Sequence, residues 1–302
     1  MKKIIAYIGL YFKEADKKVL LLTTLITAVM IFCNYYFHID RWINKNTFAL
    51  RFIYRFLISL LAFTIPYYLY NLFAGKKYFS DKFFLTLLLV AASLFSLKMS
   101  LSIHFPLSSN EQWDVYWNKV IYWPLRLIIV ILVLLLVWKK FDTAKTFFGF
   151  TIHNFNWKPY AGMLLIMIPL IAAASTQPDF LSMYPKIKTV SPGIMNAPHS
   201  WFYKLLFELS YGTDFISIEL FFRGFLVLAF LKWAGKDAIL PMACFYCTIH
   251  FGKPIGECIS SYFGGLLLGI VVYHTRSIFG GLIVHLGIAW MMEIGGYIGN
   301  AF

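Results

Sequence analysis

The C-terminal hundred residues of the sequence carry ionisable side chains inside or beside long apolar runs. Such side chains are costly in a membrane helix, so each one is a functional candidate by default. The simplest interpretation is that they have a structural role, in which they pair with one another and hold helices together. Their concentration in so short a stretch favours a shared polar cavity instead. They are Glu208, Asp214, Glu219, Arg223, His250, Glu257, His285 and Glu293.

Glu219 and Arg223 lie four residues apart in the run SIELFFRGFLVLAF, which places both on one face of a helix. The pair is either a self-neutralising structural pair or an arginine that holds a reactive carboxylate. His250 follows Tyr246 by four residues, and a second intramembrane histidine, His285, occurs in GGLIVHLGIAW. A carboxylate and two histidines from three helices can bind a divalent metal such as zinc. They can also activate a water and stabilise an oxyanion.

The remaining candidates have simpler explanations. Glu257 opens an apolar run, where the helix dipole favours a negative charge. Glu293 lies two turns beyond the second histidine, rotated by about 80° around the helix axis, and can border the same cavity. We keep these two and Tyr246 as accessory candidates. Cys244 and Cys247 form a C-x-x-C inside an apolar run, which we interpret as packing rather than a redox or zinc site.

The elements that position these residues must be membrane helices. The chain has 302 residues, of which 60% are hydrophobic and 14% are charged, against roughly 45–50% and about 25% in an average soluble domain. A chain of this size cannot bury so much apolar surface in a water-soluble core. This excludes a disordered chain and an ordinary soluble enzyme, and the continuous apolar runs argue against an outer-membrane barrel.

The formal net charge of +13 is unevenly distributed. Residues 1–199 hold 21 Lys and Arg against 8 Asp and Glu, whereas residues 200–302 hold 6 of each class. The basic residues form short clusters between apolar runs, as in membrane proteins that set their orientation and contact anionic headgroups. We therefore expect membrane lipid and no nucleic acid as a partner. The clusters at 76–77 and 139–140 favour a cytoplasmic N-terminus.

Nine apolar runs predict an all-α fold, a polytopic transmembrane helical bundle of about eight or nine helices, because several runs are short or closely spaced. Residues 102–119 and 176–200 are too polar to span and are predicted to be loops. The second loop divides the chain into basic N-terminal transmembrane helices, residues 1–199, and a C-terminal transmembrane core, residues 200–302. The nine runs are 19–37, 52–73, 83–97, 120–138, 160–175, 215–231, 238–251, 258–273 and 278–298.

The motifs of the C-terminal part resemble those of the CPBP family of intramembrane proteases, which includes the CAAX prenyl endopeptidases and the bacteriocin self-immunity (Abi) proteins. The family pattern is E-E-x-x-x-R, F-x-x-x-H and H-x-x-x-N on successive helices, matched here by IELFFR, YCTIH and HLGIA. Tyr246 takes the place of the phenylalanine. The resemblance covers roughly residues 200–295 and implies a membrane-embedded hydrolase, metalloendopeptidase-like or glutamic. Its catalytic residues would be Glu219, Arg223, His250 and His285.

Two positions depart from this pattern. Ile218 stands where the family has its first glutamate, the water-activating base, and Ala289 stands where an asparagine helps to hold the oxyanion. Strict alignment gives Glu219 the orienting role and leaves the base missing. Either Glu219, Glu257 or Glu293 has taken over as the base, or the fold survives without proteolysis.

We therefore predict an intramembrane endopeptidase that hydrolyses peptide bonds of membrane-associated or prenylated proteins through Glu/His-activated water. Arg223 beside Glu219 disfavours a cation, so we expect no tightly bound metal. A metal that did bind would use Glu219, His250 and His285. The alternatives are a catalytically impaired scaffold or self-immunity protein, and a proton-coupled transporter, for which we find no internal repeat. We expect an integral protein of a bacterial inner membrane.

Overall fold

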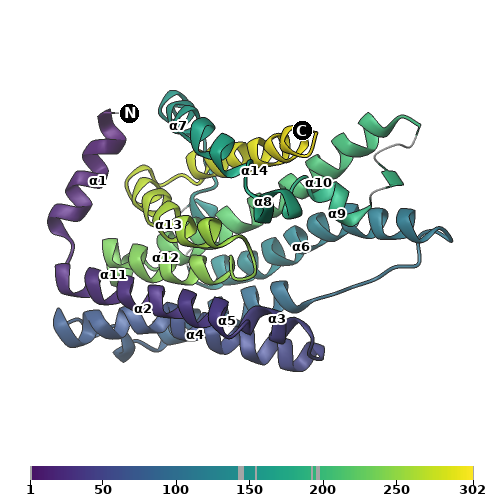
Figure 1. The fold of residues 1–302 in the computed structure, drawn as a ribbon. Helices are drawn as coiled ribbons and strands as arrows, with labels where there is room; N and C mark the ends of the chain where they lie inside the picture. Colours follow the sequence, from purple (N-terminus) through teal and green to yellow (C-terminus); the bar gives the residue numbers. More distant parts are fainter. Residues whose placement is uncertain (1, 142–145, 154, 192, 195–197, 302) are drawn as a thin grey trace.

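The computed structural model describes residues 2–141, 146–153, 155–191, 193–194 and 198–301, and throughout these residues the fold is all-α (Figure 1). Six helices are long and apolar enough to cross a membrane, judged by length and composition. The structure therefore confirms the polytopic helical bundle. The six helices are α2 (Lys17–Tyr36), α4 (Phe48–Phe73), α5 (Lys82–Ser100), α6 (Glu111–Phe141), α13 (Ile255–Thr275) and α14 (Phe279–Gly299).

Three of the nine predicted runs take other forms. The fifth run forms α7 (Lys158–Ala174), which has 17 residues. The sixth falls where α10 (Ser200–Glu219) passes directly into the π-helical segment η4 (Leu220–Ala229). The seventh forms α12 (Ile239–Thr248), which has only 10 residues. A helix that short cannot cross a hydrocarbon core of about 30 Å. Neighbouring helices must therefore occupy the rest of the membrane thickness above and below α12.

Further short helices lie before and between these elements. The predicted loop at 176–200 includes two of them in the part that the structure describes. The short helices are α1 (Lys2–Glu14), α3 (Ile39–Asn44), η1 (Tyr78–Ser80), η2 (Phe147–Gly149), α8 (Pro178–Met183), α9 (Lys186–Val190), α11 (Leu231–Ala234) and η5 (Gly235–Ala238).

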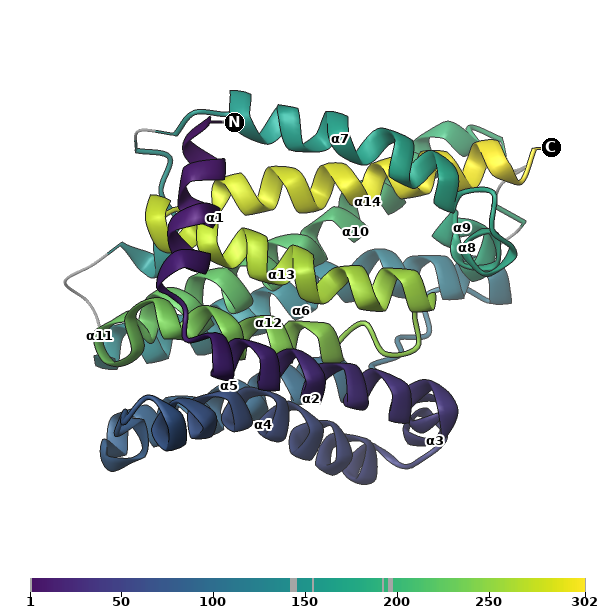
Figure 2. The ribbon, with the colours of Figure 1, turned by 60° about the vertical axis from the view of Figure 1, so that its left-hand side comes forward.

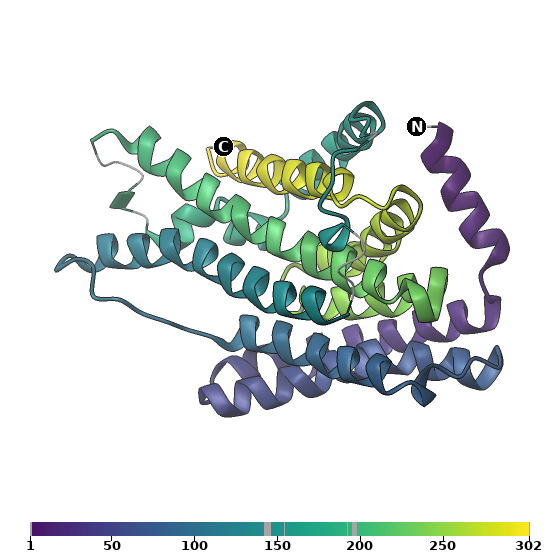
Figure 3. The same cartoon turned by 180° about the vertical axis from the view of Figure 1, so that it is seen from behind.

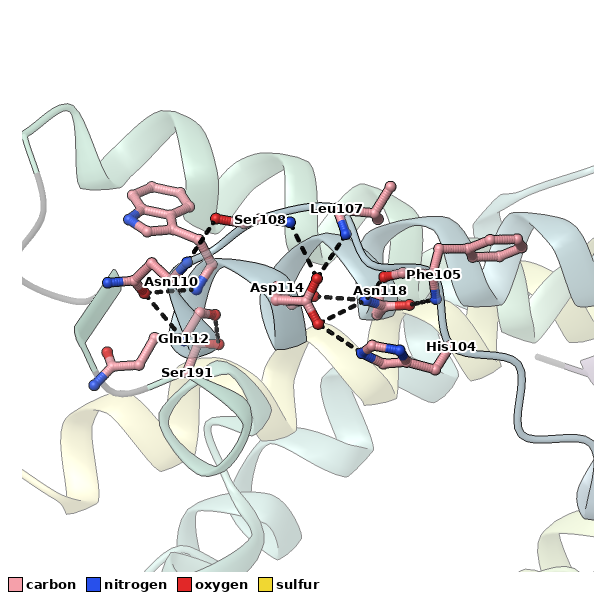
Figure 4. Close-up of polar contacts among 10 residues, drawn as sticks. His104, Phe105, Leu107, Ser108, Asn110, Gln112, Asp114, Asn118 and Ser191 are labelled. Atoms are coloured by element: carbon pink, nitrogen blue, oxygen red, sulfur yellow. Dashed lines mark hydrogen bonds and ion pairs between the residues drawn. The ribbon is translucent and has the colours of Figure 1, made fainter.

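The predicted loop at 102–119 is shorter than expected, because α6 already begins at Glu111. Asp114, in the first turns of α6, accepts hydrogen bonds from the backbone N–H groups of Leu107 and Ser108 (Figure 4). The Asp114 carboxylate also binds the His104 ring, with 2.6 Å between Oδ2 and Nε2. The helix therefore holds its own preceding loop, and this network is a structural cap.

The long helices run side by side, and α1 lies across one end of them (Figure 2). The α1 helix packs against α13, where the rings of Tyr7 and His274 stack with 4.3 Å between centroids. We call this the α1 end of the bundle. The opposite end carries α3, α8 and α9, and we call it the α3 end.

The two most enclosed elements are η4 and α12. Every residue of η4 is buried, and so are residues 239–247 of α12. Their sequences, LFFRGFLVLA and ILPMACFYCT, are apolar on all faces, as expected of a helix that packs on every side. The α12 helix contacts α2, α4, α13 and η4, while α6 runs beside α10 at the back of the bundle (Figure 3). A polar residue on either element is therefore enclosed by protein.

Candidate active site

The junction of α10 and η4 carries a buried ion pair. Arg223 Nη1 lies 3.1 Å from Glu219 Oε1, and neither side chain is exposed. The Arg223 guanidinium also lies over the ring of Tyr246 on α12, with 4.1 Å between Cζ and the ring centroid. Isolated charges in an apolar core are very costly, so each of these groups keeps the other in place.

His285, on α14, connects this ion pair to α12. Its Nδ1 lies 3.0 Å from Glu219 Oε1, and its Nε2 lies 3.0 Å from the Tyr246 hydroxyl. An ionised carboxylate only accepts hydrogen bonds, so Nδ1–H of the neutral imidazole donates to Glu219. Nε2 then accepts the hydrogen bond of the Tyr246 hydroxyl. The ring is thereby held with its basic nitrogen directed towards α12.

His250 lies just beyond the end of α12 and faces the same tyrosine. Its Nδ1 lies 3.1 Å from the backbone oxygen of Tyr246, and the two rings are 4.8 Å apart between centroids. Because a carbonyl oxygen only accepts, Nδ1–H donates and Nε2 is the acceptor nitrogen. Tyr246 therefore contacts Arg223, His285 and His250, and it is the centre of the cluster. We call these four residues, together with Glu219, the Tyr246 cluster.

The comparison with known families falls on this part of the chain. Residues 199–291 match the family model described as type II CAAX prenyl endopeptidase Rce1-like. These residues belong to the Rce1-like family. The matched stretch includes α10, η4, α12 and α13, and it ends within α14 after His285. With its membrane-length helices, the chain is an integral membrane protein that carries an Rce1-like domain. No curated protein and no solved structure matches the chain.

Glu257 of the Rce1-like domain belongs to a second polar group, close to the first. Its Oε1 lies 2.9 Å from Lys253 Nζ, and its Oε2 lies 3.1 Å from the hydroxyl of Tyr184. Burial lowers the pKa of Lys253, but the nearby Tyr184 and Glu257 outweigh this effect and raise the pKa above its usual value. Glu257 and His250 are near enough to interact electrostatically. This carboxylate is thus committed to an ion pair beside the Tyr246 cluster.

The other acidic candidates make different contacts. Glu293 is 2% exposed, and its Oε2 accepts a hydrogen bond of 2.8 Å from the backbone N–H of Lys186 on α9. The carboxyl group of Glu208 faces that of Glu293. Asp214 pairs with Lys98 of α5 at 2.8 Å, which ties α10 to the N-terminal helices. None of these three carboxylates has a recorded hydrogen bond to a histidine of the Tyr246 cluster among the described residues.

Two residues of the site lie outside the motifs. The ring of Phe215 packs edge-on against His285, with 4.7 Å between centroids. Gly281 lets α14 approach the buried carboxylate, since a Cβ atom there would lie 2.3 Å from Glu219 Oε2. Helical spacing could have found both. Phe215 is four residues before Glu219, and Gly281 is four residues before His285.

The two departures from the family pattern are apolar in the structure as well. Ile218 and Ala289 are 8% and 5% exposed, and neither side chain can accept a proton or donate a hydrogen bond. The Rce1-like domain must therefore obtain a base and an oxyanion donor elsewhere, if it is to hydrolyse a peptide.

The side chains of the Tyr246 cluster do not fit a metal ion. The carboxylate oxygen that would bind it already faces a guanidinium, and both ring nitrogens of His285 are engaged in hydrogen bonds. Within the described part of the chain, no group of three or more His, Cys, Asp and Glu is arranged as metal ligands. A metal ion could bind here only if these contacts were broken.

Proposed function

We propose that the protein is an intramembrane endopeptidase that hydrolyses peptide bonds of membrane-associated or prenylated proteins. The main support is that Glu219, Arg223, His250 and His285 meet around Tyr246 in an otherwise apolar core, inside the Rce1-like match. Residues 200–302 would be the catalytic unit, enclosed by the helices of residues 1–199. Continuous apolar helices suit a bacterial inner membrane, where we place the protein.

In the proposed mechanism His285 is the general base. The Tyr246 hydroxyl passes its hydrogen-bonded proton to Nε2 of His285 while it takes a proton from a water beside Nε2 of His250, and the oxygen of that water attacks the carbonyl carbon of the peptide. Glu219 stabilises the imidazolium that forms, and Arg223 holds the Glu219 carboxylate in place. When the tetrahedral intermediate collapses, His285 returns the proton to the leaving amine. Glu219 thus acts through His285, which compensates for the missing glutamate at Ile218.

Tyr246 would supply the second missing function. Once Nε2 of His285 has taken a proton, it no longer accepts the hydrogen bond of the tyrosine hydroxyl. The hydroxyl can then donate to the oxyanion of the intermediate, a role that the family gives to the residue at Ala289. A phenylalanine at this position, as in the family pattern, has no such donor.

The test is cleavage of prenylated and transmembrane peptides by the purified protein in detergent. We expect His285→Ala to lose about 10²–10⁴-fold in kcat, the usual contribution of a general base. Glu219→Gln and His250→Ala should also lose activity, whereas Glu14→Gln, on the exposed face of α1, should keep it. Activity should persist in a metal chelator. Full activity in His285→Ala, or loss of activity in the chelator, would contradict the mechanism.

A non-catalytic scaffold is the second candidate, and one observation favours it. Glu219 Oε2 has no hydrogen-bond partner in the described residues and lies against Gly281, so the carboxylate is closed to water. Such a protein would bind membrane peptides without cleaving them. Binding of a peptide by the wild type with no product from any substrate would favour this function over proteolysis.

A further inference from the structure

A second group of charged side chains lies outside the Rce1-like domain, near the α3 end of the bundle. Arg51 and Arg55 come from α4, Lys98 from α5 and Arg126 from α6. We call these four residues the basic cluster. Each interacts electrostatically with at least one other member. Three consecutive long helices thus bring four cations together.

The three guanidinium groups meet at the C-terminal end of α5. Arg55 donates to the backbone oxygen of Met99, and Arg126 Nη2 donates to that of Leu101 at 3.3 Å. Arg51 Nη2 donates to the Ser102 hydroxyl at 3.2 Å. The carbonyl end of a helix attracts positive charge, which explains why the first cation is tolerated here. It does not explain three, because the dipole amounts to about half an elementary charge.

The chain itself does not neutralise the cluster. Lys98 pairs with Asp214 at 2.8 Å, and Arg55 lies 3.8 Å from Asp40. Arg51 and Arg126 have no ion pair with a carboxylate among the described residues. Lys119 adds a further positive charge, since its Nζ lies 5.2 Å from the centroid of the Tyr122 ring that Arg126 also covers.

Some of these positively charged groups are buried. The Nε atoms of Arg51 and Arg126 are buried and have no hydrogen-bond partner in the described residues. The side chain of Arg55 is only 14% exposed. Buried donors without a partner are costly, and the cost falls when an anion supplies acceptors. The cluster therefore has an excess of positive charge and donor groups without a partner, both of which an anionic ligand would satisfy.

The position of the basic cluster in the fold indicates which kind of anion it can bind. Arg51 lies in the first turn of α4 and Lys98 in the last turn of α5, so the cluster is near the ends of these two helices, while Arg126 reaches it from the middle of α6. That is the depth at which phospholipid headgroups meet a spanning helix. A pocket beside Arg55 is lined by apolar residues such as Phe95 and Met99 and also by polar residues, including Asp40.

We propose that the basic cluster binds the phosphate of an anionic membrane phospholipid, with Arg51 and Arg126 as the main donors. A guanidinium group binds phosphate through two parallel hydrogen bonds, and two such groups can hold one headgroup between α4 and α6. The bound lipid completes the charge balance of the N-terminal helices. This proposal is independent of the proteolytic activity.

The experiment measures lipid retention by native mass spectrometry and thermal unfolding of the full chain in detergent. We expect the wild type to retain phosphatidylglycerol in preference to phosphatidylcholine and to unfold several degrees higher in its presence. Arg51→Gln/Arg126→Gln should need at least tenfold more phosphatidylglycerol for the same effect. The matched control Lys2→Gln/Lys3→Gln, which removes two exposed cations of α1, should behave as the wild type.

Three results would overturn the proposal. They are equal retention by the double variant, equal retention of phosphatidylcholine, and an equal thermal shift with inorganic phosphate alone, which would make the ligand a soluble anion. If the double variant does not fold, the wild type still decides the matter. No difference between the two lipids in retention or in thermal shift excludes charge recognition by the cluster.

Discussion

The Tyr246 cluster and the basic cluster both place charged groups among apolar helices, but they differ in how the charge is balanced. In the first, the single guanidinium of Arg223 faces the single carboxylate of Glu219, and neither is exposed. In the second, Arg51 and Arg126 have no carboxylate ion pair among the described residues. A charge deep in the bundle must find its partner in the chain, whereas one near a helix end can take its partner from the membrane.

The comparison predicts that breaking the deep pair has the largest effect. Arg223→Met leaves Glu219 charged and buried, so we expect a loss of about 3–5 kcal/mol in the free energy of unfolding. Thermal unfolding in detergent measures it. Glu219→Leu/Arg223→Met removes both charges and should recover most of the stability while remaining inactive. A single variant that is as stable as the wild type would show that the pair is not buried as described.

The ion pair between Lys98 and Asp214, which links α5 to α10, should contribute less to stability. Lys98→Met leaves Asp214 without its partner, but that carboxylate is 18% exposed and can be rehydrated in part. We expect a loss of about 1–3 kcal/mol in the free energy of unfolding. Lys236→Met, which removes an exposed pair with Glu14, should cause no measurable change. An equal loss of stability in Lys98→Met and Arg223→Met would show that fully and partly buried charge pairs do not differ as we expect.

A change without any charge tests how closely the Tyr246 cluster is fitted. The added methyl group of Gly281→Ala meets Glu219 Oε2 at 2.3 Å, so the carboxylate must move away from α14. We expect a loss of about 1–3 kcal/mol in stability and a fall in kcat larger than any change in KM. Gly264→Ala, on α13 with no atom within 4 Å of the new Cβ, is the control and should be neutral or slightly stabilising. An unchanged kcat in Gly281→Ala would mean that the position of Glu219 is not critical.

The smallest expected effect lies at the α1 end. Asp81 caps α5, and its hydrogen bond with Trp233, followed by those with the backbone N–H groups of Phe84 and Phe83, lowers the pKa of its carboxyl group below 3.8. A lowered carboxyl pKa adds stability above the ordinary value, and that stability is lost as the pH falls through the lowered pKa. Asp81→Ala should therefore unfold slightly earlier than the wild type at neutral pH, with the difference vanishing in strong acid. A difference that persists in acid would assign the effect to packing.

Local spacing predicted much of the site from the sequence. The four-residue intervals placed Glu219 beside Arg223 and Tyr246 beside His250, and both pairs are in contact. The contact between Glu219 and His285 was beyond such reasoning, because it depends on how closely α10 approaches α14. Gly281 permits this close approach because it has no Cβ atom.

The fold shows the same division. Composition and apolar runs predicted the all-α membrane bundle and most of its helices. Hydropathy did not reveal that the seventh run forms a helix of only 10 residues, α12, or that Glu257 and Glu293 pair with Lys253 and the backbone of Lys186. These features arise from packing between distant segments, which leaves no periodic signal in any one of them.

The π-helical segment η4 has a consequence for how the site can be altered. A π-helical turn holds one residue more than an α-helical turn. Removing a single residue from Leu220–Ala229 would change the orientation of α10 relative to the following segments by up to about 100°, the rotation that one helical residue contributes. Glu219 would turn away from His285, although no residue of the Tyr246 cluster had been replaced. The reactive arrangement therefore depends on the number of residues between its members as much as on their identity.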